Sequence, residues 1–159
     1  MDEFIIEAVP ASQKQILARH FQFYLNEHAA FTGKGPQDGV FRYRWLDAYW
    51  QAGERRWPFW MRRGDDVVAF AFIRFDDDDK HYELAEFFVV NRYRGQGHGD
   101  RLAKDVIQRF DGAWKLNQVK TNKRAIAFWR RVIGEITNYT EAPLMREDGV
   151  ERLEQRFVV

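Results

Sequence analysis

The stretch from His81 to Phe110, HYELAEFFVVNRYRGQGHGDRLAKDVIQRF, constrains the fold of this chain more than any other. It opens with a dense apolar run typical of a strand and continues into a turn with three alternating glycines, Gly95, Gly97 and Gly99. It closes with apolar residues at helical spacing, namely Leu102, Ala103, Val106, Ile107 and Phe110. The first amides of a helix lack partners within the helix and lie at the positive end of its dipole. A strand, a glycine turn and a helix in this order therefore predict a site for phosphate or pyrophosphate, which glycines without a Cβ let approach the backbone.

The spacing of the glycines excludes the two commonest nucleotide motifs. A dinucleotide-binding turn needs G-x-G-x-x-G, but no glycine lies three positions after Gly97 or Gly99, and the Gly-Lys-Ser/Thr of a P-loop is absent. What remains, Arg94-x-x-Gly97-x-Gly99, resembles the acyl-CoA-binding motif Arg/Gln-x-x-Gly-x-Gly/Ala of the GNAT superfamily of N-acyltransferases. Downstream the chain also resembles that family's second signature, Asn-x-x-Ala-x-x-Phe/Tyr-Tyr followed by a glycine-ended helix, at Asn122, Ala125, Phe128 and Gly134.

The resemblance implies a fold and an activity. We expect an α/β, single-domain GNAT-like fold over residues 1–159, with a mixed, mostly antiparallel central sheet splayed at the CoA-binding strand and helices on both faces. The implied activity is that of an N-acetyltransferase, which moves an acetyl group from acetyl-CoA, its cosubstrate, directly to a primary amine of a small-molecule or peptide acceptor. A non-catalytic acyl-CoA-binding or sensing module on the same fold is the alternative. An interaction or nucleic-acid-binding protein built on this fold is a third reading.

The strand from His81 to Val90 carries two candidate catalytic bases. Side chains alternate along a regular strand, so Glu86 and Glu83 should point to opposite faces, and the strand can present one of them to a cleft. Glu86 has apolar neighbours on both sides, where burial raises the pKa of a carboxyl group towards neutrality, as a general base requires. In the resembling family a glutamate on this strand takes a proton from the amine, directly or through water. We expect Glu86 to be this base, the alternative being an ion pair with an arginine, and Glu83 to be the lesser candidate.

The resemblance also assigns the contacts with acyl-CoA. By this resemblance, the pantetheine arm and the oxyanion of the tetrahedral intermediate would be bound by backbone groups of Phe88, Val89 and Val90. The pyrophosphate would be bound by the amides of Gly95, Gln96, Gly97, His98 and Gly99. Arg94 either adds charge near a phosphate or is simply exposed. Asn122 would contact CoA, cap the following helix, or do both.

The chain departs from the family pattern at Trp129. The second signature commonly ends in a tyrosine that protonates the leaving CoA thiolate, whereas an indole donates a hydrogen bond and is no practical acid. Tyr139, Tyr93 or water could replace the tyrosine. A thiol with a pKa of about 8.5 can also leave without an acid. Trp129 itself is predicted to lie at the cofactor site.

The remaining pattern predicts the frame of the fold. Apolar runs and turn signals predict strands and hairpins at residues 4–9, 57–63, 65–75, 112–119, 135–140 and 153–159. Ser12 is expected to cap a helix, and residues 32–39 to form a loop. The four aspartates at residues 76–79 predict a solvated turn, or else a patch that steers a cationic amine. The aromatic segment at residues 41–50 is interpreted as a helix that covers the sheet, or else as an aromatic wall for the acceptor.

Composition narrows the classes of function. The formal net charge of +1 gives no electrostatic case for binding nucleic acid or an anionic membrane. The absence of cysteine excludes disulfides, thiolate metal ligands and a cysteine nucleophile, and no metal site is expected. The N-terminus MDEFIIEAVP is unlike a signal peptide and no apolar run has membrane-spanning length, so a cytoplasmic protein is expected. The aromatic surplus and the resemblance are consistent with a homodimer.

Overall fold

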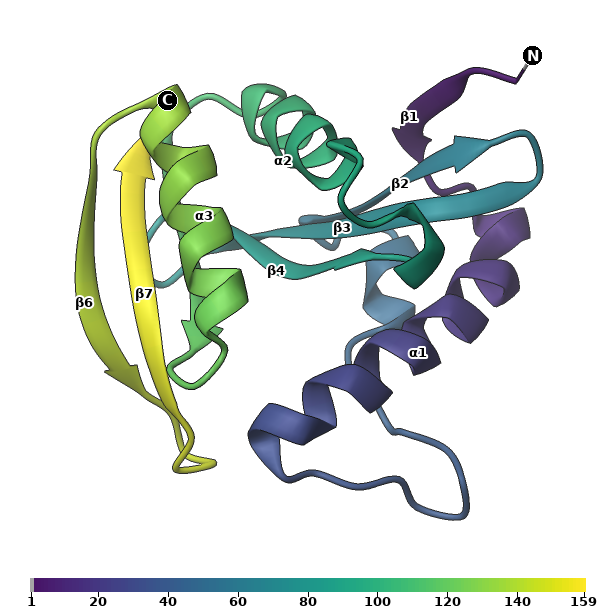
Figure 1. The fold of residues 1–159 in the computed structure, drawn as a ribbon, viewed down its shortest axis with the longest axis horizontal. Coiled ribbons are helices and arrows are strands. Elements are labelled where there is room, and N and C mark those ends of the chain that lie inside the picture. Colours follow the sequence, from purple (N-terminus) through teal and green to yellow (C-terminus); the bar gives the residue numbers. More distant parts are fainter. Residues whose placement is uncertain (1) are drawn as a thin grey trace.

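The fold is built on a mixed sheet whose two faces are both covered by helices (Figure 1). The computed structural model describes residues 2–159, in which the strand order is β1-β2-β3-β4-β5-β7-β6. The strands are β1 (Phe4–Ala8), β2 (Arg56–Arg63), β3 (Asp66–Asp76), β4 (His81–Val89), β5 (Ala113–Val119), β6 (Tyr139–Met145) and β7 (Glu151–Val158). The helices are α1 (Lys14–Thr32), α2 (His98–Gln108) and α3 (Lys123–Ile136), with short 3-10 helices η1 (Ala11–Gln13), η2 (Asp47–Trp50) and η3 (Asn91–Tyr93).

The sheet is splayed where its two parallel strands meet. Neighbouring strands among the described residues are antiparallel except for β4 and β5, which pair only at Tyr82 with Trp114 and Glu83 with Lys115. From Leu84 onward β4 keeps β3 as a partner but has lost β5. Figure 1 shows the consequence, with β3 and β4 running in a clearly different direction from β6 and β7. The expected α/β fold, with its mostly antiparallel and splayed sheet, is confirmed.

Each face of the sheet has its own apolar core. Leu102, Val106 and Ile107 of α2 join α3 residues over one face. On the other face Leu17 and Phe21 of α1 are fully buried and pack against β3 and β4. The helical spacing of these apolar residues explains their burial, because residues three and four positions apart share one side of a helix. Helices on both faces are therefore confirmed.

A β-bulge in β4 changes which side chains share a face. Phe72 of β3 pairs with Glu86 and Ile73 pairs with Leu84, so Ala85 is an extra residue without a partner on β3. An extra residue shifts the alternation by one position. Glu83 and Glu86 consequently lie on the same face of the sheet, and Leu84 belongs to the core on the opposite face. The prediction that β4 could present one glutamate alone is wrong.

Several element boundaries also differ from the sequence predictions. Ser12 caps no helix, since it lies inside η1 and α1 begins after Gln13. Residues 41–50 form a turn and η2 rather than a regular helix. Helix α3 continues past Gly134 to Ile136, so the following strand begins at Tyr139 and extends to Met145. Pro143 is compatible with β6 because this is an edge strand, where a missing backbone donor is tolerated.

Candidate active site

Three cavities surround the bulged half of β4. The turn cavity, of about 810 Å³, lies against the glycine turn and α3. The charged cavity, of about 570 Å³, lies between η2 and the closed end of the splay, and the loop cavity, of about 470 Å³, lies against residues 32–43. Glu86 lines both the charged and the loop cavity, whereas Tyr24 lines both the loop and the turn cavity. The splay therefore joins three spaces at the middle of β4.

The turn cavity gathers most of the residues expected to hold acyl-CoA. Its lining includes Phe88, Val89, Arg94, Gly95, Gly97, His98, Gly99, Asn122 and Trp129. Gln96 and Val90 do not belong to this lining. Residues from β4, the turn, α2 and α3 thus meet at one space although they are far apart along the chain.

The glycine turn has the geometry of an anion site. Gly95 and Gly97 have φ angles of +71° and +83°, in the left-handed region that favours glycine, and Gly97 is the N-cap of α2. The first hydrogen bond of the helix runs from the Arg101 amide to the Gly97 carbonyl, at 3.1 Å. The amides of His98, Gly99 and Asp100, which come before it, therefore have no partner within the helix. A Cβ on Gly99 would lie 3.1 Å from Val89 Cγ2, which explains the glycine at this close approach of α2 to β4.

Arg94 has a role that neither sequence interpretation named. Its two terminal nitrogens donate to the carboxylate of Glu27 on α1 at 2.9 and 2.7 Å. Its Nε donates to the Val89 carbonyl at 2.9 Å. Arg94 therefore ties α1 to the end of β4 and supports the turn, rather than extending freely towards a phosphate.

Three further residues of the predicted cofactor site also line the turn cavity. The His98 ring stacks on Phe4 with centroids 4.2 Å apart, so the ring is turned towards β1. Asn122 Oδ1 accepts from the Ala125 amide at 3.2 Å and caps α3 while lining the cavity, which makes the capping and cavity roles compatible. Trp129 is buried edge-to-face against Phe87, with centroids 4.9 Å apart.

The backbone of β4 offers one amide of the three considered for the oxyanion. The Val90 amide donates to the Val68 carbonyl at 2.9 Å, and Phe88 is paired with Phe70 across the same two strands. Backbone groups of successive residues point to opposite sides of a strand. The Val89 amide therefore points away from β3, into the splay.

Glu86 has the environment of a general base. It is partly exposed to the charged and loop cavities and accepts a hydrogen bond from the Tyr24 hydroxyl. Burial raises its pKa to about 7, although hydrogen bonds from Tyr24 and Tyr43 act in the opposite direction. A carboxyl group with this pKa exchanges protons near neutral pH.

Glu83 shares the face of Glu86 but is held in ion pairs. It is buried, and its Oε1 accepts from Arg74 Nε at 2.8 Å. Its other oxygen lies 3.8 Å from Lys115 Nζ. Lys115 in turn contacts Asp76 at 2.6 Å and Asp79 at 2.9 Å, so the prediction of a fully solvated aspartate turn is wrong for two of its four carboxylates. The sequence analysis missed this because the lysine that neutralises them comes from β5.

Tyr139 lies away from the three cavities. Three strand pairings separate it from β4. Tyr139 of β6 pairs with Phe157 of β7, Phe157 pairs with Trp114 of β5, and Trp114 pairs with Tyr82 at the closed end of the splay. This register places Tyr139 on the far side of the joined strands, so the prediction that it could replace the missing tyrosine acid has no geometric support. The hydroxyl of Tyr93, another candidate, donates to Asp66 at 2.9 Å.

Tyr24 is the site residue that the sequence analysis missed. Tyr24 belongs to the apolar side of α1, together with Leu17 and Phe21, and packs on Phe70 and Phe88. Its hydroxyl nevertheless reaches Glu86, which is far away along the chain. The polar end of an otherwise apolar helix stripe was the one available signal.

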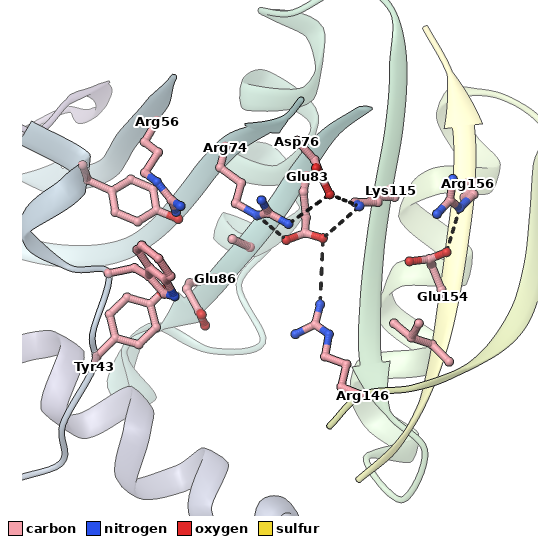
Figure 2. Close-up of a pocket in the computed structure, with 14 residues that line it drawn as sticks. Tyr43, Arg56, Arg74, Asp76, Glu83, Glu86, Lys115, Arg146, Glu154 and Arg156 are labelled. Carbon is pink, nitrogen blue, oxygen red and sulfur yellow. Dashed lines mark hydrogen bonds and ion pairs between the residues drawn. The ribbon is translucent and has the colours of Figure 1, made fainter. Parts of the chain in front are cut away.

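The aromatic segment before β2 covers the core without forming the predicted helix, and it also lines a cavity. Tyr43, Leu46, Tyr49 and Trp50 pack against the core under α1. Tyr43, Trp45 and Tyr49 also line the charged cavity beside Glu86 (Figure 2). The segment is thus part of the core and a wall of the cavity.

Neither a metal-binding group nor a membrane-spanning helix occurs among residues 2–159. No group of three or more histidine, aspartate or glutamate side chains is arranged to hold a metal ion in this part of the chain. Across the same residues, no helix combines the length and the apolar character needed to cross a membrane.

Comparison with known proteins links this site to a family. Residues 21–134 match the model of the acetyltransferase (GNAT) family. No curated protein matches the sequence significantly.

Solved structures match the fold over nearly the whole chain. An acetyltransferase from Thermus thermophilus has a TM-score of 0.70 at 16% identity and covers 100% of both chains. The ribosomal-protein-S18-alanine N-acetyltransferase from Escherichia coli has a TM-score of 0.68 at 17% identity, covering 99% of this chain and 94% of that one. The spermidine N-acetyltransferase from Vibrio cholerae, solved with CoA and spermine, has a TM-score of 0.70 at 9% identity, covering 98% and 95%.

Proposed function

This chain belongs to the acetyltransferase (GNAT) family, and from this premise we propose that it transfers an acetyl group from acetyl-CoA to a primary amine. The observation that carries the proposal is the position of Glu86. It lies on the bulged strand where the cavities meet, with a pKa of about 7 and a hydrogen bond from Tyr24, which also lines the turn cavity.

The turn cavity fits the cosubstrate. The amides that open α2 and the left-handed glycines before it suit a pyrophosphate. The unpaired side of β4 suits the pantetheine arm, because its backbone groups have lost β5 as a partner. The Vibrio cholerae neighbour with bound CoA supports this assignment by its similar fold.

The reaction proposed is a direct transfer. The Glu86 carboxylate takes a proton from the ammonium form of the acceptor, and the neutral amine nitrogen then forms a bond to the thioester carbonyl carbon. The Val89 amide donates to the oxyanion that results, and the bond between carbon and sulfur breaks to release CoA. The proton required by the thiolate comes from water or through Tyr24, since Trp129 cannot supply one.

A non-catalytic acyl-CoA-binding module is the second candidate, and Trp129 at the place of the usual tyrosine is the observation that favours it. Such a module would bind CoA without releasing thiol in the presence of amines. A cytoplasmic location and a homodimer stay predictions.

The test is thermal unfolding with and without acetyl-CoA, followed by thiol release against a panel of amines. A ligand at about 100 times its dissociation constant should add about 2.7 kcal/mol to the free energy of unfolding and raise the melting temperature by several degrees. Stabilisation with amine-dependent thiol release supports the transferase. Stabilisation without release supports the module, and no stabilisation by millimolar acetyl-CoA or CoA overturns both.

A further inference from the structure

Most charged side chains that line the charged cavity neutralise one another. Three close ion pairs account for them, with distances of 2.8, 2.6 and 2.7 Å: Arg74 with Glu83, Lys115 with Asp76, and Arg156 with Glu154. Figure 2 draws these contacts as dashed lines along the side of the cavity that faces β5 and β7. A ligand gains little by competing with them, because a separated buried pair leaves an uncompensated charge.

The two remaining arginines of the same lining make only longer contacts with carboxylates. Arg146 lies in the turn between β6 and β7, and its nearest carboxylate is Glu83 at 3.9 Å, which Arg74 already holds. Its side chain is 46% exposed and lines both the charged and the loop cavity. Arg56 lies over Trp45 and Tyr49, with its guanidinium carbon 5.0 and 5.4 Å from the ring centroids.

Arg56 is the more enclosed of the two arginines. Its side chain is 14% exposed, and its nearest carboxylate is the half-exposed Glu54 at 3.5 Å. In Figure 2, which does not draw Glu54, Arg146 carries one long contact, to Glu83. Both guanidinium groups therefore keep donors that a bound anion could use.

Tyr49 adds a neutral donor to the same wall. The residue is 4% exposed and lines the charged cavity beside Arg56. Its hydroxyl is buried and has no hydrogen-bond partner among residues 2–159. Buried polar groups are ordinarily paired, so an unpaired hydroxyl at a cavity wall points to a missing partner.

Glu86 is the complementary group. Within the described lining of the charged cavity, it is the one carboxylate without an ion pair, and it accepts a hydrogen bond from the Tyr24 hydroxyl. The groups of this cavity that other side chains do not neutralise are thus the Glu86 carboxylate at the bulge, the guanidinium groups of Arg146 and Arg56, and the Tyr49 hydroxyl. A polyamine would place cations against the two arginines, which opposes its binding.

We propose that the acceptor is a primary amine that carries a carboxylate, of the amino-acid class, with its amine at Glu86 and its carboxylate at Arg146. The inference deepens the proposed function and rests on it. Arg56 and the Tyr49 hydroxyl, on the other wall of the cavity, offer donors to a further polar group of the acceptor. The arginines set which amine is accepted, whereas the proton transfer belongs to Glu86.

The experiment compares acceptors that differ in the carboxylate alone. Thiol release from acetyl-CoA is measured with the common L-amino acids, each against its C-terminal amide, and with putrescine and spermidine as polyamines. The melting temperature of the CoA-saturated protein is recorded with the same compounds. We expect at least one free acid to be used with a kcat/KM at least tenfold above that of its amide, and to raise the melting temperature where the amide does not.

The arginine variants assign the preference to the proposed residues. Arg146→Gln, an exposed position, should raise the KM for the acid about tenfold with little change in kcat, and leave the KM for the amide unchanged. Arg56→Gln, on the other wall, should change the KM for the acid and for the amide alike. Arg19→Gln, on α1 and outside the lining of the charged cavity, is the matched control and should keep the preference.

Each contrary outcome is decisive. Amides or polyamines used as well as the acids would overturn the proposal, as would no response to any acid in either measurement. An unchanged KM in Arg146→Gln, with a fold intact by its melting temperature, would overturn the assignment to Arg146. The proposed function fails separately, when acetyl-CoA itself neither stabilises the protein nor releases thiol.

Discussion

At the scale of single residues, Glu86 shows how position sets chemistry. A glutamate in water would be fully ionised at neutral pH and a poor base. Burial on β4 raises its pKa to about 7, and the hydroxyls of Tyr24 and Tyr43 keep the shift from growing larger by donating to the carboxylate. The group therefore combines a useful fraction of ionised base with enough basicity to take a proton.

The substitution Glu86→Gln tests the base. It keeps the size and an acceptor for Tyr24 but cannot take a proton, so kcat/KM should fall by a factor of roughly 100 to 10,000. In the wild type, kcat/KM should rise with pH through an inflection near the Glu86 pKa of about 7, because the ionised form is the active one. Thiol release measured across the pH range tests both the loss of activity in the variant and the inflection in the wild type. Activity of Glu86→Gln within a few-fold of wild type would contradict the assignment of Glu86 as the base.

The same variant tests the stability linked to the Glu86 pKa. The pKa of Glu86 rises from an ordinary 4.5 to about 7 on folding, so the folded state holds the proton more tightly than the unfolded chain. Its contribution to stability is complete below pH 4.5 and is lost as the pH rises through 7, by up to about 3 kcal/mol. Glu86→Gln should unfold at a higher temperature than wild type at pH 8 and show a smaller difference at pH 5. Equal differences at both pH values in thermal unfolding would argue against the raised pKa.

Tyr24→Phe removes a hydrogen bond that favours the ionised Glu86. The pKa of Glu86 should therefore rise further, and the acidic limb of the pH profile should move to higher pH. Tyr139→Phe is the comparison, since Tyr139 lies outside the three cavities and should keep the wild-type profile. The measurement is the pH profile of kcat/KM for both variants. An acidic limb at the wild-type position in Tyr24→Phe, or a shifted limb in Tyr139→Phe, would contradict the contact of Tyr24 with Glu86 as the cause.

At the scale of elements, β4 and the turn after it organise the site. The bulge at Ala85 turns both glutamates to one face, and the loss of β5 beyond Glu83 frees one edge of the strand. The turn then places left-handed glycines before α2, where the amides of the first helical turn are unpaired. One short segment thereby carries the proposed base, the free backbone edge and the proposed anion site.

Gly97→Ala tests the anion site against a matched control. Both Gly97 and Gly149 have positive φ angles and open space at the Cβ position, +83° and +74° respectively. Alanine at either position should cost about 1 to 2 kcal/mol in free energy of unfolding, because an L-residue is strained in that region. Gly97→Ala alone should also weaken acetyl-CoA binding, measured by calorimetry, because its methyl group stands at the mouth of the anion site. Equal affinity in both variants would remove the turn from the binding site.

At the scale of the whole molecule, two halves of the sheet are joined by few backbone contacts. Strands β4 and β5 share two residue pairs, and side chains reinforce this junction. Lys115 of β5 contacts Asp76 and Asp79 at the turn after β3, and Arg156 of β7 also contacts Asp79 at 3.2 Å. The ion cluster holds closed the end of the sheet from which the splay opens.

Lys115→Met should therefore be costly. It leaves the carboxylates of Asp76 and Asp79 without their main counterion, and breaking a buried pair in this way costs about 3 to 5 kcal/mol. Lys120→Met is the control, since Lys120 is exposed and its contact with Glu151 is 3.4 Å long; it should change stability by less than about 1 kcal/mol. Denaturant unfolding of both variants is the measurement, and a similar small loss in each would show that the cluster does not hold the sheet.

The acid sensitivity of the fold should follow the same cluster. The hydrogen bond from Lys115 lowers the pKa of Asp76 to about 2. A lowered carboxyl pKa stabilises the fold above the unfolded value of 3.8, and that stability is lost as the pH falls towards 2. Wild type should lose stability across this window, and Lys115→Met should lose less. Parallel pH dependence in the two proteins would contradict the assignment.

The sequence alone determined the parts of this protein that depend on local chemistry. Glycines at alternate positions after an apolar strand fix a turn that a helix follows, and helical spacing fixes which side of α2 is buried, since both depend on residues within a few positions of one another. The residues around the glycine turn and Asn122, expected at one cofactor site, do meet at one cavity. Glu86 could be singled out as the candidate base because burial and charge conflict within one short run of residues.

Only the tertiary structure decided the relations between distant segments. The bulge at Ala85 depends on pairing with β3, so an isolated strand gives no sign that Glu83 and Glu86 share a face. The hydroxyl of Tyr24 reaches Glu86 from α1, and Lys115 reaches two aspartates from β5, because packing brings together residues whose separation in sequence carries no information about distance. The register of β6 and β7 removed Tyr139 from the site for the same reason. Local preference is a property of neighbours along the chain, whereas a site is a property of neighbours in space.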